Sequence, residues 1–141
     1  MEGKSTIELN QGLMSEPNLA SYLASNRSAF SDQDITQPLS RLFKASGMSK
    51  AELARQAGMS EVYLYQVFSG RRKPSRDRLL CICMGLRASL EEIQQILKQG
   101  EYAVLYSKHK RDAIISHGIL HCTSLGEINE RLFQEKEKPL Y

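Results

Sequence analysis

The chain of 141 residues suits one compact domain, or one small domain with helical extensions. Its hydrophobic content of 41% and charged content of 25% are ordinary for a globular protein, and no apolar run approaches the ~18 residues of a membrane span. The opening residues lack the cationic and apolar regions of a secretory signal. These features exclude membrane and secreted classes, and we expect a cytoplasmic protein.

The net charge of +3 is unevenly distributed along the chain. Residues 1–43 carry three basic and five acidic side chains (net −2), and residues 81–141 carry eight of each (net zero). Residues 44–80 carry eight basic and three acidic side chains, a net charge of +5. Such a local basic stretch is expected of a surface that binds a polyanion, and it is also compatible with a merely solvated face.

Apolar residues recur at helical spacing along the chain, and no stretch alternates with the period of two that a strand requires. The sequence therefore predicts an all-α protein. Residues 1–14 resemble a loose tail, and Ser15-Glu16-Pro17 predicts the opening of a first helix over residues 16–30, followed by a polar link at 31–34. The apolar stripe of this first helix comprises Leu19, Tyr22, Leu23 and Phe30.

Later helix starts carry a common signal, in which Ser is followed three residues later by Glu. These capping boxes are Ser49/Glu52, Ser89/Glu92 and Ser124/Glu127. Gly47 suits the left-handed cap that ends a helix. With the first helix, the predicted helices span residues 16–30, 36–46, 50–57, 61–69, 75–86, 90–100, 109–121 and 125–136.

Residues 76–106 align without gaps on residues 111–141, with identity at ten of 31 positions. Each copy begins with Arg-Asp, contains Ser-Leu-x-Glu-Ile before its second helix, and ends with Leu-Tyr. Two copies are too few for a solenoid. We interpret them as two stacked helical hairpins, although chance similarity between capped helices is the alternative.

The segment 50–69 has the features of a helix-turn-helix. A short amphipathic helix ends at Gly58, which can adopt the positive φ of a sharp turn, and Ser60 caps a second helix. Ala54 is small where the two helices should cross. The apolar positions expected to fix the crossing are Leu53, Ala57, Leu64 and Val67.

With its flanks, the segment SKAELARQAGMSEVYLYQVFSGRRKPSRDRLL resembles the Cro/repressor-type helix-turn-helix family, also called the Xre family. The resemblance covers about residues 36–100. It implies a lambda-repressor-like domain of five helices that binds double-stranded DNA, usually as a homodimer, and regulates transcription. The expected organisation is a tail and helix at 1–34, the helix-turn-helix domain at 35–106, and a C-terminal helical hairpin at 107–141.

In a helix-turn-helix, the second helix lies in the major groove, with its N-terminal half against base edges. At helical spacing, the outward face of this helix presents the candidates for base contact. Gln66 suits an adenine, Val62 a thymine methyl group, and Glu61 the amino group of cytosine. The candidates for base contact are therefore Glu61, Val62, Tyr65 and Gln66.

A second set of residues is expected to contact DNA phosphates, which fix register and supply salt-dependent affinity. These candidates are Lys50, Ser60, Ser69, Arg71, Arg72 and Lys73. The second helix departs from the family because it contains Tyr63, Tyr65 and Phe68 but no Arg or Lys. Its composition is typical of a protein-binding face, so a repurposed protein-interaction module is the alternative function.

Other residue groups give no sign of catalysis, metal binding or a cofactor. His117 and His121 have the spacing of a metal clamp but no evident partner ligands, so we interpret them as ordinary histidines. Cys81, Cys83 and Cys122 show no CxxC spacing and are expected to be small buried residues. No phosphate loop or nucleophile motif is present, and we predict that the protein is not an enzyme. A small effector bound between the C-terminal hairpins is a further possibility.

Overall fold

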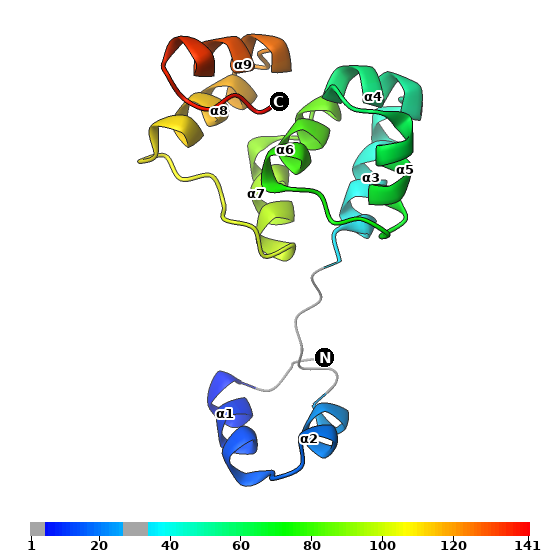
Figure 1. Cartoon of the computed structure of the whole chain (residues 1–141), viewed down its shortest axis with the longest axis vertical. Helices are drawn as coiled ribbons and strands as arrows, with labels where there is room; N and C mark the ends of the chain where they lie inside the picture. The colour runs from blue at the N-terminus through cyan, green and yellow to red at the C-terminus, as the bar shows by residue number, and fades with distance from the viewer. Residues whose placement is uncertain (1–4, 27–33) are drawn as a thin grey trace. The chain divides into compact units, whose positions relative to one another are not determined.

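The computed structural model describes residues 5–26 and 34–141, and these two ranges belong to two compact units, which we treat separately. All regular elements of the described residues are α-helices (Figure 1), which confirms the predicted all-α class. In these residues the helices are α1 (Thr6–Ser15), α2 (Leu19–Ser25), α3 (Thr36–Ser46), α4 (Lys50–Ala57), α5 (Glu61–Phe68), α6 (Arg76–Gly85), α7 (Leu90–Gln99), α8 (Lys110–Leu120) and α9 (Leu125–Gln134).

The N-terminal unit differs from the sequence prediction. The expected tail at 1–14 is wrong because α1 occupies most of it, beginning where the Ser5 hydroxyl accepts a hydrogen bond from the Glu8 N–H (3.2 Å). The predicted helix over 16–30 is also wrong in extent. Ser15 ends α1, and Asn18 caps α2 by accepting from the Ser21 N–H (3.3 Å).

The predicted apolar stripe of the first helix has three described residues, and one of them is buried. Tyr22 is 6% exposed, whereas Leu19 and Leu23 are 67% and 44% exposed, because two short helices offer too little surface to cover them. Gly12 allows the close approach of the Tyr22 ring, since a Cβ at that position would lie 3.4 Å from it. Phe30, the fourth residue of the stripe, lies outside the described residues.

In the second unit the predicted helices are confirmed, with ends shifted by at most two residues. Gly47 and Gly58 both have φ of 70°, the left-handed conformation that their positions after α3 and α4 require. All three predicted Ser caps accept from the backbone N–H three residues on. The reciprocal bond from the Glu side chain completes the capping box at Ser89/Glu92, whereas at Ser49 and Ser124 the hydroxyl half alone is made.

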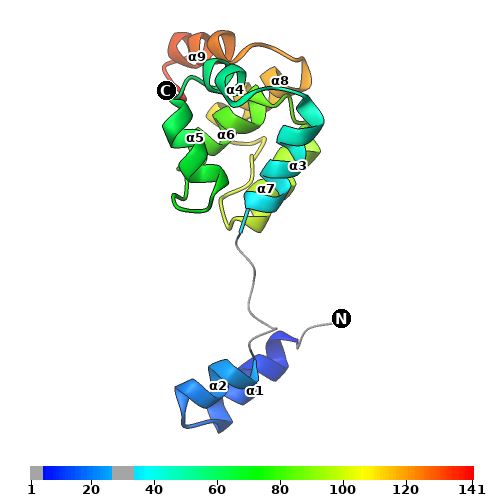
Figure 2. The same ribbon diagram turned by 90° about the vertical axis from the view of Figure 1, so that its right-hand side faces the viewer.

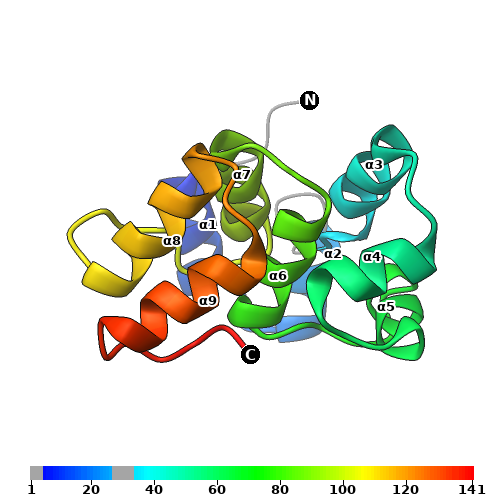
Figure 3. The same cartoon turned by 90° about the horizontal axis from the view of Figure 1, so that it is seen from above.

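Helix α6 forms the centre of the second unit. Figure 3 shows it between the α4–α5 pair and the α8–α9 hairpin. Helices α3 and α7, which overlap in the view of Figure 2, line one groove with side chains that include Leu42 and Ile96. Six of its ten residues are buried, and Gly85 lets α4 approach because a Cβ there would lie 3.0 Å from Leu53 and 3.3 Å from Ala57. The fully buried side chains of the core come from every helix of this unit; the largest are Leu39, Leu53, Leu64, Leu79, Leu80, Ile82, Ile93, Leu97, Ile115, Ile128 and Leu132.

The sequence repeat corresponds to two helical hairpins, α6–α7 and α8–α9, that make the same internal contacts 35 positions apart. Gln94 exchanges two hydrogen bonds with the backbone of Leu105, and its counterpart Asn129 bonds Leu140 and Tyr141. In each copy the first Arg also donates to two carbonyls of that copy's final segment. The acceptors are Ala103 and Val104 for Arg76, and Lys138 and Pro139 for Arg111.

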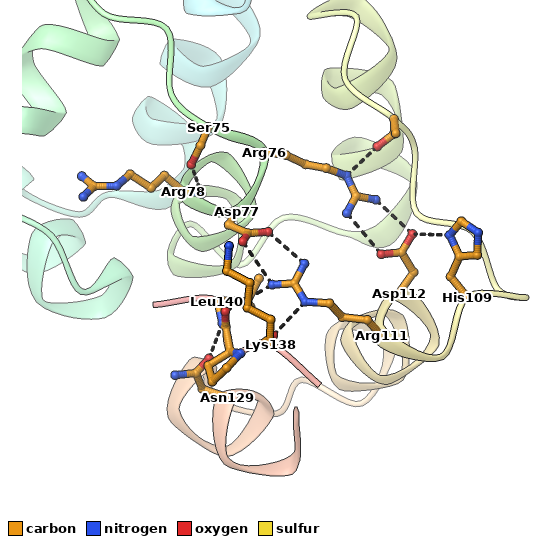
Figure 4. Close-up of polar contacts among 12 residues, drawn as sticks. Ser75, Arg76, Asp77, Arg78, His109, Arg111, Asp112, Asn129, Lys138 and Leu140 are labelled. Atoms are coloured by element: carbon orange, nitrogen blue, oxygen red, sulfur yellow. Dashed lines mark hydrogen bonds and ion pairs between the residues drawn. The ribbon is translucent and has the colours of Figure 1, made fainter. Parts of the chain in front are cut away.

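The two hairpins are joined by reciprocal ion pairs between their Arg-Asp dipeptides (Figure 4). Arg76 donates to both carboxylate oxygens of Asp112 (3.1 and 3.0 Å), and Arg111 donates to both oxygens of Asp77 (3.0 and 3.1 Å). Residue i of one copy therefore contacts residue j of the other, and j contacts i, as in an isologous dimer interface. This pairing is the structural reason for the shared Arg-Asp sequence.

A cavity of about 430 Å³ lies where the turns of the two hairpins meet, lined by residues including Arg87, Gly118 and Cys122. Within the described part of the chain, no helix is long and apolar enough to span a lipid bilayer.

Candidate nucleic-acid interface

Helices α4 and α5 form the helix-turn-helix predicted from the sequence. Helix α4 buries Leu53, Ala54 and Ala57, and α5 buries Leu64 and Val67, so the apolar positions expected to fix the crossing are confirmed. After Gly58, the chain enters α5 at Ser60, whose hydroxyl accepts from the Tyr63 N–H (3.1 Å). The turn and the cap together fix the direction in which α5 leaves α4.

The four candidates for base contact share the outward side of α5. Glu61, Val62 and Tyr65 are exposed and Gln66 is partly exposed. The side chains of Val62 and Tyr65 stand out, with 67% and 57% of their surface accessible. Side chains that read bases must be free to enter a groove of the DNA. The outward face of α5 is accessible to solvent in the second unit.

Two of the candidates for phosphate contact, Ser60 and Ser69, already use their hydroxyls within α5. The Ser60 hydroxyl caps the helix, and the Ser69 hydroxyl donates to the Gln66 carbonyl (3.1 Å). A phosphate could still be bound at Ser60 by the backbone N–H groups of the first turn of α5. The Ser60 hydroxyl, which acts as an acceptor in the cap, also keeps its own O–H as a donor.

The partly exposed Lys50 has its ammonium group near three aromatic rings. Its ammonium nitrogen is 4.7 Å from the ring centroid of Phe43, 4.9 Å from that of Tyr65 and 5.5 Å from that of Phe68. All three distances fall within the range of a cation–π interaction. Lys50 therefore holds the Tyr65 ring, which links a phosphate candidate to a base candidate.

The basic loop after α5 is fixed at both ends. Gly70 adopts φ of 81°, and the Arg72 N–H donates to the Gln66 carbonyl (3.1 Å). The buried Pro74 accepts a hydrogen bond at its carbonyl from the Tyr102 hydroxyl (2.6 Å). Burial, with a smaller effect from Tyr63, raises the pKa of Tyr102 above its ordinary value.

The three cations of this loop have different surroundings. The Lys73 ammonium lies 4.9 Å from the Tyr102 ring centroid, and the Arg72 guanidinium carbon lies 5.7 Å from that of Tyr63. Arg71 is exposed and contacts no ring among the described residues.

Sequence reasoning missed Arg78, whose guanidinium carbon lies 4.4 Å from the Tyr63 ring centroid. Arg78 occupies the first turn of α6, a helix that the sequence presents as apolar and buried. Arg78 lies near α5 because of the way α6 packs against the helix-turn-helix. A sequence pattern within a few residues does not predict that packing.

The remaining chemistry-bearing side chains lie elsewhere. Cys81 and Cys83 are buried as predicted, but the prediction is wrong for Cys122, which is exposed because it turns the chain after α8 with φ of 53°. His117 and His121 are exposed, with stacked rings 4.0 Å apart. Among the described residues, no group of three or more His, Cys, Asp or Glu side chains is placed to hold a metal ion.

Comparison with models of protein families matched residues 38–96 to the helix-turn-helix domain. Comparisons of the chain with curated proteins and with solved structures gave no match. The matched range begins in α3, contains the whole of α4, α5 and α6, and ends in α7. This part of the chain is similar to helix-turn-helix domains, and the match includes the α4–α5 pair described above.

Proposed function

We propose that this protein is a sequence-specific DNA-binding regulator of transcription that places α5 in the major groove. The observation that carries the proposal is the combination of an accessible α5 face with the basic loop Arg71–Lys73, inside a matched helix-turn-helix domain. Residues 44–80, which contain both features, carry a net charge of +5, more than the +3 of the whole chain.

The proposed roles separate affinity from specificity. The loop cations Arg71, Arg72 and Lys73, with Lys50 and the N-terminal turn of α5 at Ser60, bind backbone phosphates. Ser69, next to this loop, is also proposed to contact a phosphate. The residues proposed to contact bases are Glu61, Val62, Tyr65 and Gln66.

We also propose that two copies bind one operator as a homodimer, with one α5 in each half-site. A helix-turn-helix dimer of this kind contacts half-sites about 10 base pairs apart, or a multiple of that spacing. A pseudo-palindromic selected site with this spacing is the expected result, and a selected site without internal symmetry would contradict the dimer.

The first experiment is a fluorescence-anisotropy titration of random-sequence duplex DNA at several salt concentrations. The wild-type protein is compared with an Arg71→Ala/Arg72→Ala/Lys73→Ala variant and with a control that removes the same charge elsewhere, Lys98→Ala/Lys108→Ala/Arg131→Ala. Binding by the wild type that falls steeply with salt, is lost in the first variant and persists in the control supports the proposal. No binding by the wild type at low salt overturns it.

Base readout is tested after a preferred site has been selected from a random pool. Gln66→Ala is expected to lower affinity for that site by about 1–3 kcal/mol while leaving affinity for scrambled DNA unchanged. Equal losses on both DNAs would show that Gln66 does not read bases.

A second candidate function is a module that binds a partner protein through the same face of α5. The exposed Val62 and Tyr65 favour it, together with the lack of Arg or Lys in α5. Exposed aromatic side chains and depleted charge are typical of protein interfaces. A partner recovered with the wild type but lost with Tyr65→Ala, in a protein that does not bind DNA, would support this function over the first. A partner retained by Tyr65→Ala would exclude this face.

A further inference from the structure

The ring of Tyr63 contacts two guanidinium groups from different elements. Arg78, in the first turn of α6, has its guanidinium carbon 4.4 Å from the ring centroid, and Arg72, in the loop after α5, has its own at 5.7 Å. Both distances lie within the ~6 Å range of a cation–π interaction. We call Tyr63, Arg72 and Arg78 the Tyr63 cluster. Its two guanidinium carbons lie within about 10 Å of each other.

Within residues 5–26 and 34–141, neither cation of the Tyr63 cluster has an acidic partner. Among the described residues, the ion pairs involve other side chains, and Asp77 is bound through both oxygens to Arg111. Figure 4 shows Arg78 extending away from that pair. Two like charges therefore lie at one ring, and an anion bound between them would be attracted by both.

We propose that the Tyr63 cluster binds the DNA backbone, with Arg72 and Arg78 donating to phosphate oxygens and Tyr63 acting as the positioning residue. This inference rests on the proposed DNA-binding function. A guanidinium that stacks on an aromatic face keeps its N–H edge free, and that edge matches the geometry of a phosphate. A side chain already held by a ring also loses less conformational freedom on binding.

Tyr63 lies on α5, the helix proposed to enter the major groove, and so joins the Tyr63 cluster to that helix. Tyr63 is half-buried on α5, and its backbone N–H donates to the Ser60 hydroxyl that caps this helix. Val62 and Tyr65 lie on the same helix. The Tyr63 cluster therefore places two proposed phosphate contacts beside the helix whose outward face is proposed to read bases.

The test uses full-length protein and random-sequence duplex DNA, titrated by anisotropy at several salt concentrations. Arg78→Ala is expected to weaken binding to every sequence and to reduce the salt slope by about one unit. Tyr63→Leu is expected to weaken binding about three- to tenfold with the slope nearly unchanged, because both cations remain. Tyr63→Phe, which keeps the ring, should restore the affinity. Arg131→Ala in α9 serves as the control for loss of one exposed cation.

A double-mutant cycle distinguishes positioning from a general structural role. If Tyr63 acts through the two cations, Tyr63→Leu should have little further effect in an Arg72→Ala/Arg78→Ala background. An undiminished effect there, or a Tyr63→Phe variant as weak as Tyr63→Leu, overturns the positioning role. If Arg71→Ala weakens binding while Arg78→Ala equals the wild type, the DNA-binding function stands and the Tyr63 cluster is excluded. Failure of the wild type to bind DNA overturns both.

Discussion

At the scale of single residues, Gly118 marks the closest approach between α8 and α9. A Cβ at Gly118 would clash with Ile128 Cγ1, whereas one at Gly126 would meet nothing nearer than the Tyr141 hydroxyl at 4.0 Å. Both glycines are helical, so the sequence alone does not tell them apart. Gly118 in the second hairpin is the counterpart of Cys83 in the first. The second hairpin requires glycine at this position because α9 packs against it through Ile128.

Gly118→Ala is therefore expected to lower the free energy of unfolding by about 1–3 kcal/mol, since the added carbon overpacks the contact with Ile128. Gly126→Ala is the matched control and should be neutral or raise it by up to about 1 kcal/mol, because alanine favours helix. Urea unfolding followed by circular dichroism measures both. Equal losses for the two variants would contradict a steric cause at Gly118.

The three cysteines should differ in reactivity. Burial raises the pKa of both Cys81 and Cys83 to about 12, with nearby Asp77 adding to the effect at Cys81, so neither forms thiolate near neutral pH. Cys122 is exposed. An aromatic disulfide reagent at pH 7–8 should titrate one thiol of the native protein and three in denaturant. Cys122→Ser should abolish the native reaction, and rapid native reaction of two thiols would contradict the buried positions.

At the scale of the elements, helix starts were the most predictable feature of the second unit. A Ser cap forms its hydrogen bond within three residues, and the left-handed Gly47 and Gly58 act within one turn. The first unit had similar local signals, but two of them competed. Ser15-Glu16-Pro17 has the composition of a helix opening, and the Asn18 cap three residues further on sets the actual start.

Ser60→Ala is expected to lower the free energy of unfolding by about 0.5–2 kcal/mol, since α5 loses the bond to the Tyr63 N–H. Ser60→Asp should retain most of the stability because a carboxylate also caps a helix. Ser40→Ala, in the middle of α3, is the control and should stay within about 0.5 kcal/mol of the wild type. Chemical unfolding measures all three, and a Ser60→Ala variant as stable as Ser40→Ala would argue against the cap.

At the scale of the whole second unit, the reciprocal ion pairs connect the C-terminal hairpin to the first turn of α6. Asp112 is 5% exposed and receives Arg76, while Asp77 receives Arg111. The same turn of α6 carries Arg78, which contacts the recognition helix through Tyr63. The hairpin outside the matched domain thus supports a turn that faces the proposed DNA-binding surface.

Acid is expected to weaken this connection. Burial raises the pKa of the Asp112 carboxyl, but hydrogen bonds from Arg76 and the Tyr106 N–H, with the charges of Arg76 and His109, outweigh it and leave the pKa below its usual range. A carboxyl whose folded pKa is depressed stabilises the protein above its unfolded pKa of ~4, and this stabilisation is lost as the pH falls through the folded pKa.

Asp112→Asn should therefore lower the free energy of unfolding at pH 7 by about 1.5–3 kcal/mol, the range of a hydrogen bond to a charged group. Below pH ~4 the difference from the wild type should shrink. Asp34→Asn is a control, because its exposed carboxyl also has a lowered pKa but lies outside the interface between the hairpins. Urea unfolding at pH 7, 4 and 3 measures the difference, and a constant difference over that range would contradict the proposed linkage.

The sequence by itself determined the all-α class, the helices of the second unit, the helix-turn-helix and the duplicated segments. These features depend on hydrogen bonds and apolar spacing within a few residues, so local patterns record them. The tertiary structure decided which Arg pairs with which Asp, where Arg78 lies, and that Cys122 is exposed. Each of these depends on contacts or burial between segments far apart in the chain. Their geometry is set by how the helices pack around α6, and no local pattern specifies that packing.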